Sequence, residues 1–285
     1  MARPAPRTLA LALIAVLVAL VAAGCGGGGD GGGEDLTEGL TPAELLTRSA
    51  AAAGDLESFR IALAVKGTTE VSSAAGLPQG LGGLLNGPID LSGEGPVAPP
   101  DRASIDATLR VSGIGLQVNL TRVGDEVFLG VLGQDFVLDL PPEQVGLLDF
   151  GDLYPTLASW TTDPAEAGRE DVDGDPTVKL TGTLDPAAAL GDLGPLLGTG
   201  AITPAQARRA VSEGTVEMWI GTEDLLPRRV HLVLKADGTG VADGVGKVDI
   251  DLTADFSAFD EPVDIQAPSN PQPLDPDQLG SLVGG

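Results

Sequence analysis

The sequence has very little of the two residues from which zinc sites and many catalytic triads are built. Among 285 residues there is one cysteine, Cys25, and one histidine, His231. A single cysteine excludes an internal disulfide and any metal site that needs several cysteines. His231 alternates with Val230 and Leu232, a pattern that places it on the water-facing side of a strand. We therefore expect no catalytic residue, no metal and no cofactor.

Basic and aromatic residues are scarce as well. Sixteen Lys and Arg stand against 41 Asp and Glu, a net charge of −25, and aromatics make up 3%. An acidic surface of this kind repels nucleic acid and anionic lipid headgroups, so no nucleic-acid partner is expected. The stretch 171–175 (DVDGD) resembles the start of a calcium loop, but Pro176 replaces the required glycine. A turn is the better interpretation of that stretch.

A hydrophobic run long enough to span a membrane is also missing from the N-terminus. The apolar run Leu9–Ala23 has fifteen residues, whereas a spanning helix needs about 20. Arg3 and Arg7 precede it, and small residues end it, which is typical of a signal peptide. The end, LVAAGC at 20–25, resembles the bacterial lipobox, which makes Cys25 the residue that receives lipid. Residues 1–24 are thus predicted to be a lipoprotein signal peptide.

The segment after Cys25 reads as a flexible tether. Seven of the next eight residues are glycine, and such chains behave as random coils. Two or three acyl chains on one cysteine give stable membrane attachment. We therefore expect 25–40 to tether the chain to the outer face of the cell membrane, outside the cytoplasm, ahead of one domain at 41–265. Residues 266–285 hold four prolines without periodicity and are predicted to be a disordered tail.

Alternation of apolar and polar residues, typical of strands with one buried face, dominates the chain after Leu56. Short turns such as Ser112-Gly113 predict antiparallel neighbours. Counting shorter candidates, the sequence predicts about ten strands. The clear runs are Phe59–Lys66, Ala103–Val111, Ile114–Thr121, Thr177–Leu184, Arg229–Lys235 and Lys247–Asp255, and the shorter ones are Ile89–Gly95, Glu126–Leu132, Phe136–Leu140 and Thr215–Gly221.

Helical signals are few. Thr41-Pro42 and Thr203-Pro204 each provide a cap followed by proline in the first turn, predicting helices to about Ala53 and Ser212. Asp185-Pro186 opens a third, and 152–160 is a fourth candidate. The fold class predicted is α+β, with a large antiparallel sheet. Three or four short helices cannot cover the whole apolar face of ten strands, and the uncovered part must bend back, meet a partner or hold a ligand.

Several segments resemble the mycobacterial LppX/LprA/LprF/LprG lipoprotein family. They are a helix with a D-P turn (154–164), a segment similar to the family's A-x-G-x-E followed by a glycine turn (166–174), a V-K-L-T-G-T strand (178–183), a V-E-M-W-I strand (216–220) and D-E-V-F-L at 125–129. Their order and spacing cover roughly residues 41–257. Two departures, the Gly-rich 81–85 and the Gly-interrupted 190–200, leave the size of any cavity open.

The resemblance implies a strongly curved antiparallel half-barrel with helices on its concave face, similar in fold to LolA and LolB. It also implies an apolar cavity for acylated lipid or glycolipid carried between envelope layers, a possible membrane transporter as loading partner, and a monomer. The alternative is an anchored envelope scaffold without lipid cargo, and a third possibility is an acid/base hydrolase. From strand parity alone, the residues expected to line the cavity are Ile105, Leu109, Leu116, Val118, Leu129, Leu138, Leu180, Ile220 and Leu232.

Overall fold

The structure is a computed structural model, and it describes residues 34–71, 87–111, 114–139, 145, 149–193, 203–239 and 245–274. The chain divides into two compact units, Met1–Glu34 and Asp35–Gly285. The fold described below is that of the second unit. The predicted signal peptide, Cys25, most of the tether, the 81–85 stretch and residues 275–285 lie outside the described residues.

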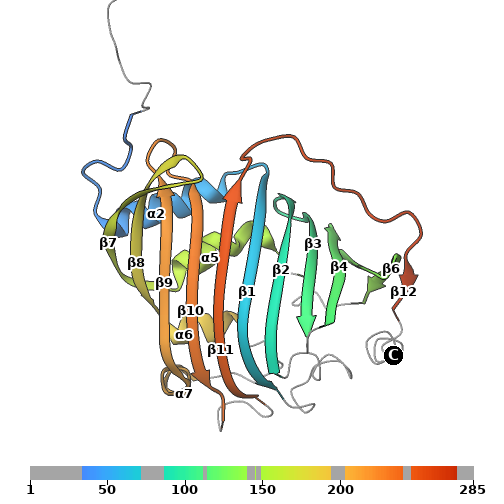
Figure 1. Cartoon of the computed structure of the whole chain (residues 1–285). Helices are drawn as coiled ribbons and strands as arrows, with labels where there is room; N and C mark the ends of the chain where they lie inside the picture. The colour runs from blue at the N-terminus through green and yellow to red at the C-terminus, as the bar shows by residue number, and fades with distance from the viewer. Residues whose placement is uncertain are drawn as a thin grey trace, which may run out of the picture. The chain divides into compact units, whose positions relative to one another are not determined.

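One open sheet forms the body of this unit (Figure 1). Its twelve strands follow the order β12-β6-β5-β4-β3-β2-β1-β11-β10-β9-β8-β7. All neighbours pair antiparallel except β12, which pairs parallel with β6. The strands are β1 (Phe59–Val71), β2 (Gly87–Ala98), β3 (Arg102–Val111), β4 (Ile114–Val123), β5 (Glu126–Val131), β6 (Gln134–Leu138), β7 (Thr161–Val172), β8 (Asp175–Leu184), β9 (Val211–Gly221), β10 (Pro227–Asp237), β11 (Val245–Ser257) and β12 (Gln272–Pro273).

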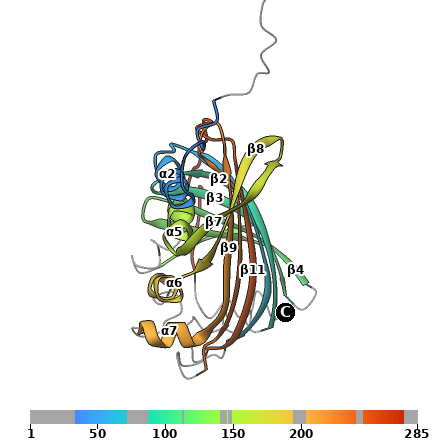
Figure 2. The same ribbon diagram turned by 90° about the vertical axis from the view of Figure 1, so that its left-hand side faces the viewer.

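Four α-helices and one short 3-10 helix are described, all lying on one face of the sheet, which curves around them (Figure 2). Thr41 and Thr203 cap two of them, each through a reciprocal bond with the residue three positions on, as their sequence predicts. The helices are α2 (Pro42–Gly54), η2 (Phe150–Asp152), α5 (Leu153–Ser159), α6 (Pro186–Leu193) and α7 (Pro204–Ala210).

Two glycines on the helix side allow neighbouring strands to approach closely where the sheet bends. A Cβ built on Gly95 in β2 would lie 1.8 Å from the Ser104 carbonyl oxygen of β3. A Cβ on Gly67 in β1 would lie 1.9 Å from the Asp249 carbonyl oxygen of β11. Real Cβ atoms never come this close to backbone, so only glycine fits these positions.

The predicted fold class is confirmed: the sheet is curved and almost wholly antiparallel, with helices on its concave face. Three details differ. β7 is not among the strands that the sequence predicts, because its apolar and polar residues do not alternate: as an edge strand it is exposed along most of its length. The helix expected to reach Ser212 stops at Ala210, where β9 begins. The predicted tail contains β12, whose two residues pair with Phe136 and Val137.

Candidate functional site

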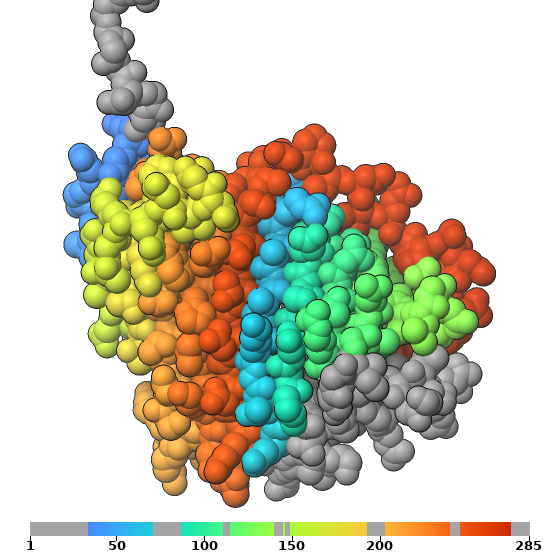
Figure 3. Space-filling model, in the orientation of Figure 1, coloured from blue at the N-terminus to red at the C-terminus, as the bar shows by residue number. Residues whose placement is uncertain are grey.

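The face of the sheet without helices, which is toward the viewer in Figure 3, is polar, and oppositely charged side chains pair across its strands. The His231 ring lies between two carboxylates, with Nδ1 3.2 Å from Glu217 and Nε2 3.1 Å from Asp251. The Lys179 ammonium lies 2.7 Å from Glu217 and covers the ring of Trp219. His231 therefore occupies the predicted face, although it is half-buried among partners rather than freely solvated.

Glu217 is the most connected carboxylate on this polar face. Burial alone would raise its pKa, but the hydrogen bonds from Lys179 and His231 outweigh burial and lower it. Its interactions are those of a surface charge network. Within the described residues there is no cluster of three or more His, Cys, Asp or Glu that could hold a metal ion.

The helix side of the sheet is apolar, and its burial changes along the strands. The strands end at two opposite sides of the sheet. We call the side where β1 begins and β11 ends the tether edge, and the side where β1 ends and β11 begins the far edge. Next to the tether edge, Ile61 is 1% exposed and Phe256 5%, and both pack under α2 and α5. Further along the same face, Leu63 is already half-buried. The helices thus close only part of the face.

A continuous row of apolar side chains crosses five strands, between the middle of the strands and the far edge. The register places Leu252, Val65, Leu91, Leu109 and Leu116 side by side on β11, β1, β2, β3 and β4. All five are half-buried, although a packed core would cover them. We call this row the apolar band. Ile250 and Leu234 extend it by one further row toward the far edge and are half-buried as well.

An open hollow of about 1260 Å³ lies over β1 to β6, at the same half of the sheet. Residues from both faces of the sheet line the hollow. Leu116 and Val118 come from the apolar, helix-bearing face, and Asp106 and Asn119 come from the polar face. On the polar face the Asn119 amide donates to Asp106 at 2.9 Å, and its oxygen accepts from Thr121 at 2.7 Å. This polar network is satisfied internally.

The nine residues predicted to line a cavity fall into three groups. Ile105, Leu180, Ile220 and Leu232 lie in the closed core, between 0% and 7% exposed. Leu109 and Leu116 belong to the apolar band, and Leu116 and Val118 line the hollow. Leu129 and Leu138 are half-buried on β5 and β6. The structure brings into the band three residues absent from the prediction, although their alternation in the sequence marks the same face: Val65, Leu91 and Leu252.

No helix in the described part of the chain is both long and apolar enough to cross a membrane. This statement does not cover residues 1–33.

Comparison with known proteins finds similarity at the level of solved structures alone. No protein-family model and no curated protein sequence matches the chain. The chain is similar to the crystal structure of lipoprotein LppX of Mycobacterium tuberculosis, with 19% identity, a TM-score of 0.48, and coverage of 79% of this chain and 98% of LppX. For LprF of Mycobacterium bovis the values are 17%, 0.48, 80% and 97%.

A LolA superfamily protein of Nitrosomonas europaea matches at 11% identity and a TM-score of 0.28, over 77% of this chain and 93% of its own. The resemblance noted from the sequence is thereby confirmed in one respect: LppX and LprF are among the solved structures to which this chain is similar.

Proposed function

We propose that this protein binds the acyl chains of a lipid or glycolipid on the apolar band and carries the lipid between layers of the cell envelope. The observation that supports the proposal is the row of five apolar side chains on the concave face, all of which stay half-buried. Binding and release require no chemical reaction, so we expect no enzymatic activity.

The energetics of such a site suit a carrier. Burying one methylene out of water is worth about 0.8 kcal/mol, so two sixteen-carbon chains would gain about 25 kcal/mol from water. The donor, however, is a membrane, in which those chains are already dry. Transfer from a bilayer to an apolar face is then close to neutral, and a lipid can be both taken up and given away.

The proposal includes the anchor. Cys25, lipidated after removal of residues 1–24, would hold the domain at the outer face of the cell membrane. Lipidation at this residue would consume the only thiol of the chain. Intact mass spectrometry of the membrane-extracted protein tests this directly, since the mature chain beginning at Cys25 would carry the added mass of a diacylglyceryl group.

Two residues on opposite faces of the sheet give a matched test of lipid binding. Leu109 on β3 points to the helix side, in the band, whereas Thr253 on β11 points to the opposite face, and both are half-buried. We expect Leu109→Trp to fill the band and to reduce the co-purified lipid seen by native mass spectrometry. Thr253→Trp adds the same bulk on the opposite face, away from the hollow, and should leave the lipid content of the protein unchanged.

The wild-type protein should carry acylated lipid when it is expressed in a related bacterium. Thermal unfolding of both variants establishes that they are folded. Equal lipid loading of the two Trp variants, or a wild-type protein that carries no lipid, would contradict the proposed function; specific capture of an envelope protein by an empty wild-type chain would favour the scaffold alternative.

A further inference from the structure

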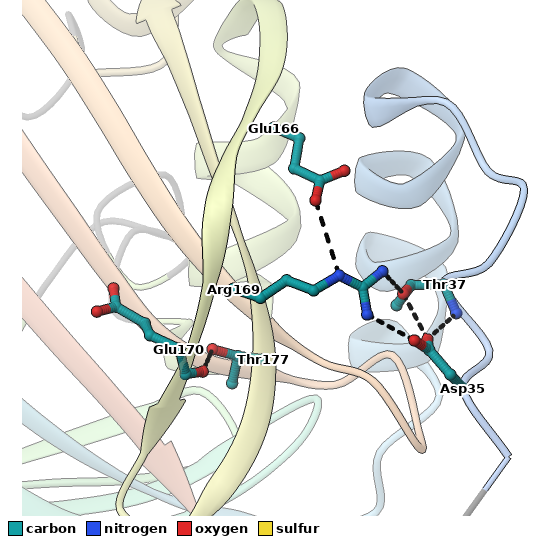
Figure 4. Close-up of polar contacts among 6 residues, drawn as sticks. All are labelled: Asp35, Thr37, Glu166, Arg169, Glu170 and Thr177. Atoms are coloured by element: carbon teal, nitrogen blue, oxygen red, sulfur yellow. Dashed lines mark hydrogen bonds and ion pairs between the residues drawn. The ribbon is translucent and has the colours of Figure 1, made fainter.

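The residues just ahead of α2 are fastened to the sheet by an arginine on β7 (Figure 4). Nη1 of Arg169 lies 2.5 Å from a carboxylate oxygen of Asp35, and Nη2 donates to the Thr37 hydroxyl at 2.9 Å. The Thr37 amide and hydroxyl both donate to the second Asp35 oxygen. Glu166 adds a weaker ion pair, 3.7 Å from Nε of Arg169. We call this group of contacts the latch.

A backbone bond continues the latch at the tether edge. The Leu36 amide donates to the Thr222 carbonyl at 2.8 Å, just after β9 ends. Thr37 is 5% exposed, so this segment is packed into the domain. The latch thus fixes the chain at Asp35, five residues before Leu40 packs against the hydrophobic core.

The position of the latch sets the number of residues between Cys25 and the first described contact with the sheet. From Cys25 to Asp35 there are ten residue steps, which reach at most about 33–36 Å when fully extended. With the latch open, the free chain runs to Leu40, fifteen steps, and reaches about 50–54 Å. The strands β1 and β11 have 13 residues each, so the two edges of the sheet are separated by about 43 Å.

The distance between the two edges lies between the reach of the tether with the latch closed and its reach with the latch open. To bring the far edge to the membrane, the domain must turn over. The tether must then run along the side of the domain over the whole length of the strands, about 43 Å. A latched tether is too short for this, and an open one is long enough. The half-buried apolar side chains lie toward the far edge.

We propose that the Arg169 latch decides which edge of the domain can touch the membrane that holds its anchor. Closed, it keeps the tether edge toward that membrane and turns the far edge outward. Open, it lets the far edge reach the same membrane. The inference rests on the proposed lipid anchor at Cys25, and it holds whether or not a lipid occupies the band.

The orientation can be measured with one label on either end of β11. Because Cys25 would be blocked by lipid, a cysteine introduced at Ser257 (tether edge) or Lys247 (far edge), both exposed, would be the only free thiol. An environment-sensitive nitrobenzoxadiazole label at each site is read in phosphatidylcholine vesicles carrying spin-labelled headgroups, which quench nearby fluorophores. With the latch intact, we expect quenching at 257 and background quenching at 247.

Arg169→Gln should raise quenching at 247 to the level found at 257, and Asp35→Asn should act in the same way. Arg110→Gln is the matched control, since Arg110 makes one exposed pair with Asp90 at 3.7 Å on a distant strand, and it should change neither signal. Intact mass identifies the lipid on Cys25: its absence would overturn the anchor and the latch together. A lipidated protein in which Arg169→Gln leaves both signals unchanged, or in which both sites are quenched equally from the start, would overturn the latch alone.

Discussion

Replacing Gly95 with alanine should destabilise the domain by straightening the sheet. The added Cβ would lie 1.8 Å from the Ser104 carbonyl oxygen, and a tolerable contact needs at least 3.0 Å, so β2 and β3 must separate by more than an ångström. Losing two backbone hydrogen bonds costs about 1–3 kcal/mol, and overpacking adds about 1–3 kcal/mol. We therefore expect a loss of about 2–6 kcal/mol in the free energy of unfolding.

In a domain of this size, each kcal/mol lowers Tm by about 2–4 °C, so Tm should fall by at least about 4 °C. Circular dichroism during heating measures it. Gly54→Ala is the matched control, because a Cβ at Gly54 in α2 meets no atom within 4 Å, and its Tm should not fall. If both substitutions leave Tm within about 1 °C of the wild-type value, the close approach of β2 and β3 is not what holds the curvature.

Three further predictions concern titratable and buried polar groups. Burial raises the pKa of Tyr154, the only tyrosine, so absorbance at 295 nm should show no phenolate until the protein unfolds above pH 10; ordinary ionisation near pH 10 in the folded protein would contradict this. Ser49→Ala leaves the buried Tyr154 hydroxyl without its 2.7 Å partner and should cost about 1–3 kcal/mol in urea unfolding, whereas Ser49→Ala combined with Tyr154→Phe should cost less than the two changes summed. The hydrogen bond from Thr37, and then that from Arg169, lowers the pKa of Asp35. The ionised carboxylate therefore stabilises the latch fully above the ordinary pKa of an aspartate, and this stabilisation is lost as the pH falls through the lowered pKa. Quenching of the label at position 247 should rise on acidification, and a rise on making the solution alkaline would refute the assignment.

The strands that pair on both sides were predictable because their two faces differ. Six of them place aliphatic residues on the helix side and polar residues on the other face, so that apolar and polar residues alternate in the sequence: β1, β3, β4, β8, β10 and β11. β7 has a neighbour on one side only and is exposed along most of its length, so its sequence shows no alternation of apolar and polar residues. Its two register shifts, next to Pro164 and Gly168, further disturb any pattern.

The site was predictable only in part. Strand parity correctly assigns Leu109 and Ile105 to the same face, but it gives no position along the strand relative to the helices. Ile105 lies under them, in the core, while Leu109, four residues on, is half-buried in the band. Where α2 and α5 stop covering the sheet depends on tertiary packing, and no local signal in β3 encodes it.

The latch could not be foreseen from the sequence either. Asp35 and Arg169 are 134 residues apart, and each looks like an ordinary surface charge among many. They meet because Leu36 bonds to Thr222 at the end of β9, two strands from β7. Contacts of this kind arise from topology, which brings the first described residues to the edge strand.

The central claim is that acyl chains lie on the apolar band, and photo-crosslinking tests it most directly. A phospholipid with a diazirine near the end of one acyl chain is loaded into the lipidated protein, illuminated, and the modified residues are mapped by tandem mass spectrometry. We expect crosslinks at Val65, Leu91, Leu109, Leu116 and Leu252, which share one face of five adjacent strands. Crosslinks confined to the opposite face, or no crosslink above that of a protein with Leu109→Trp, would contradict it.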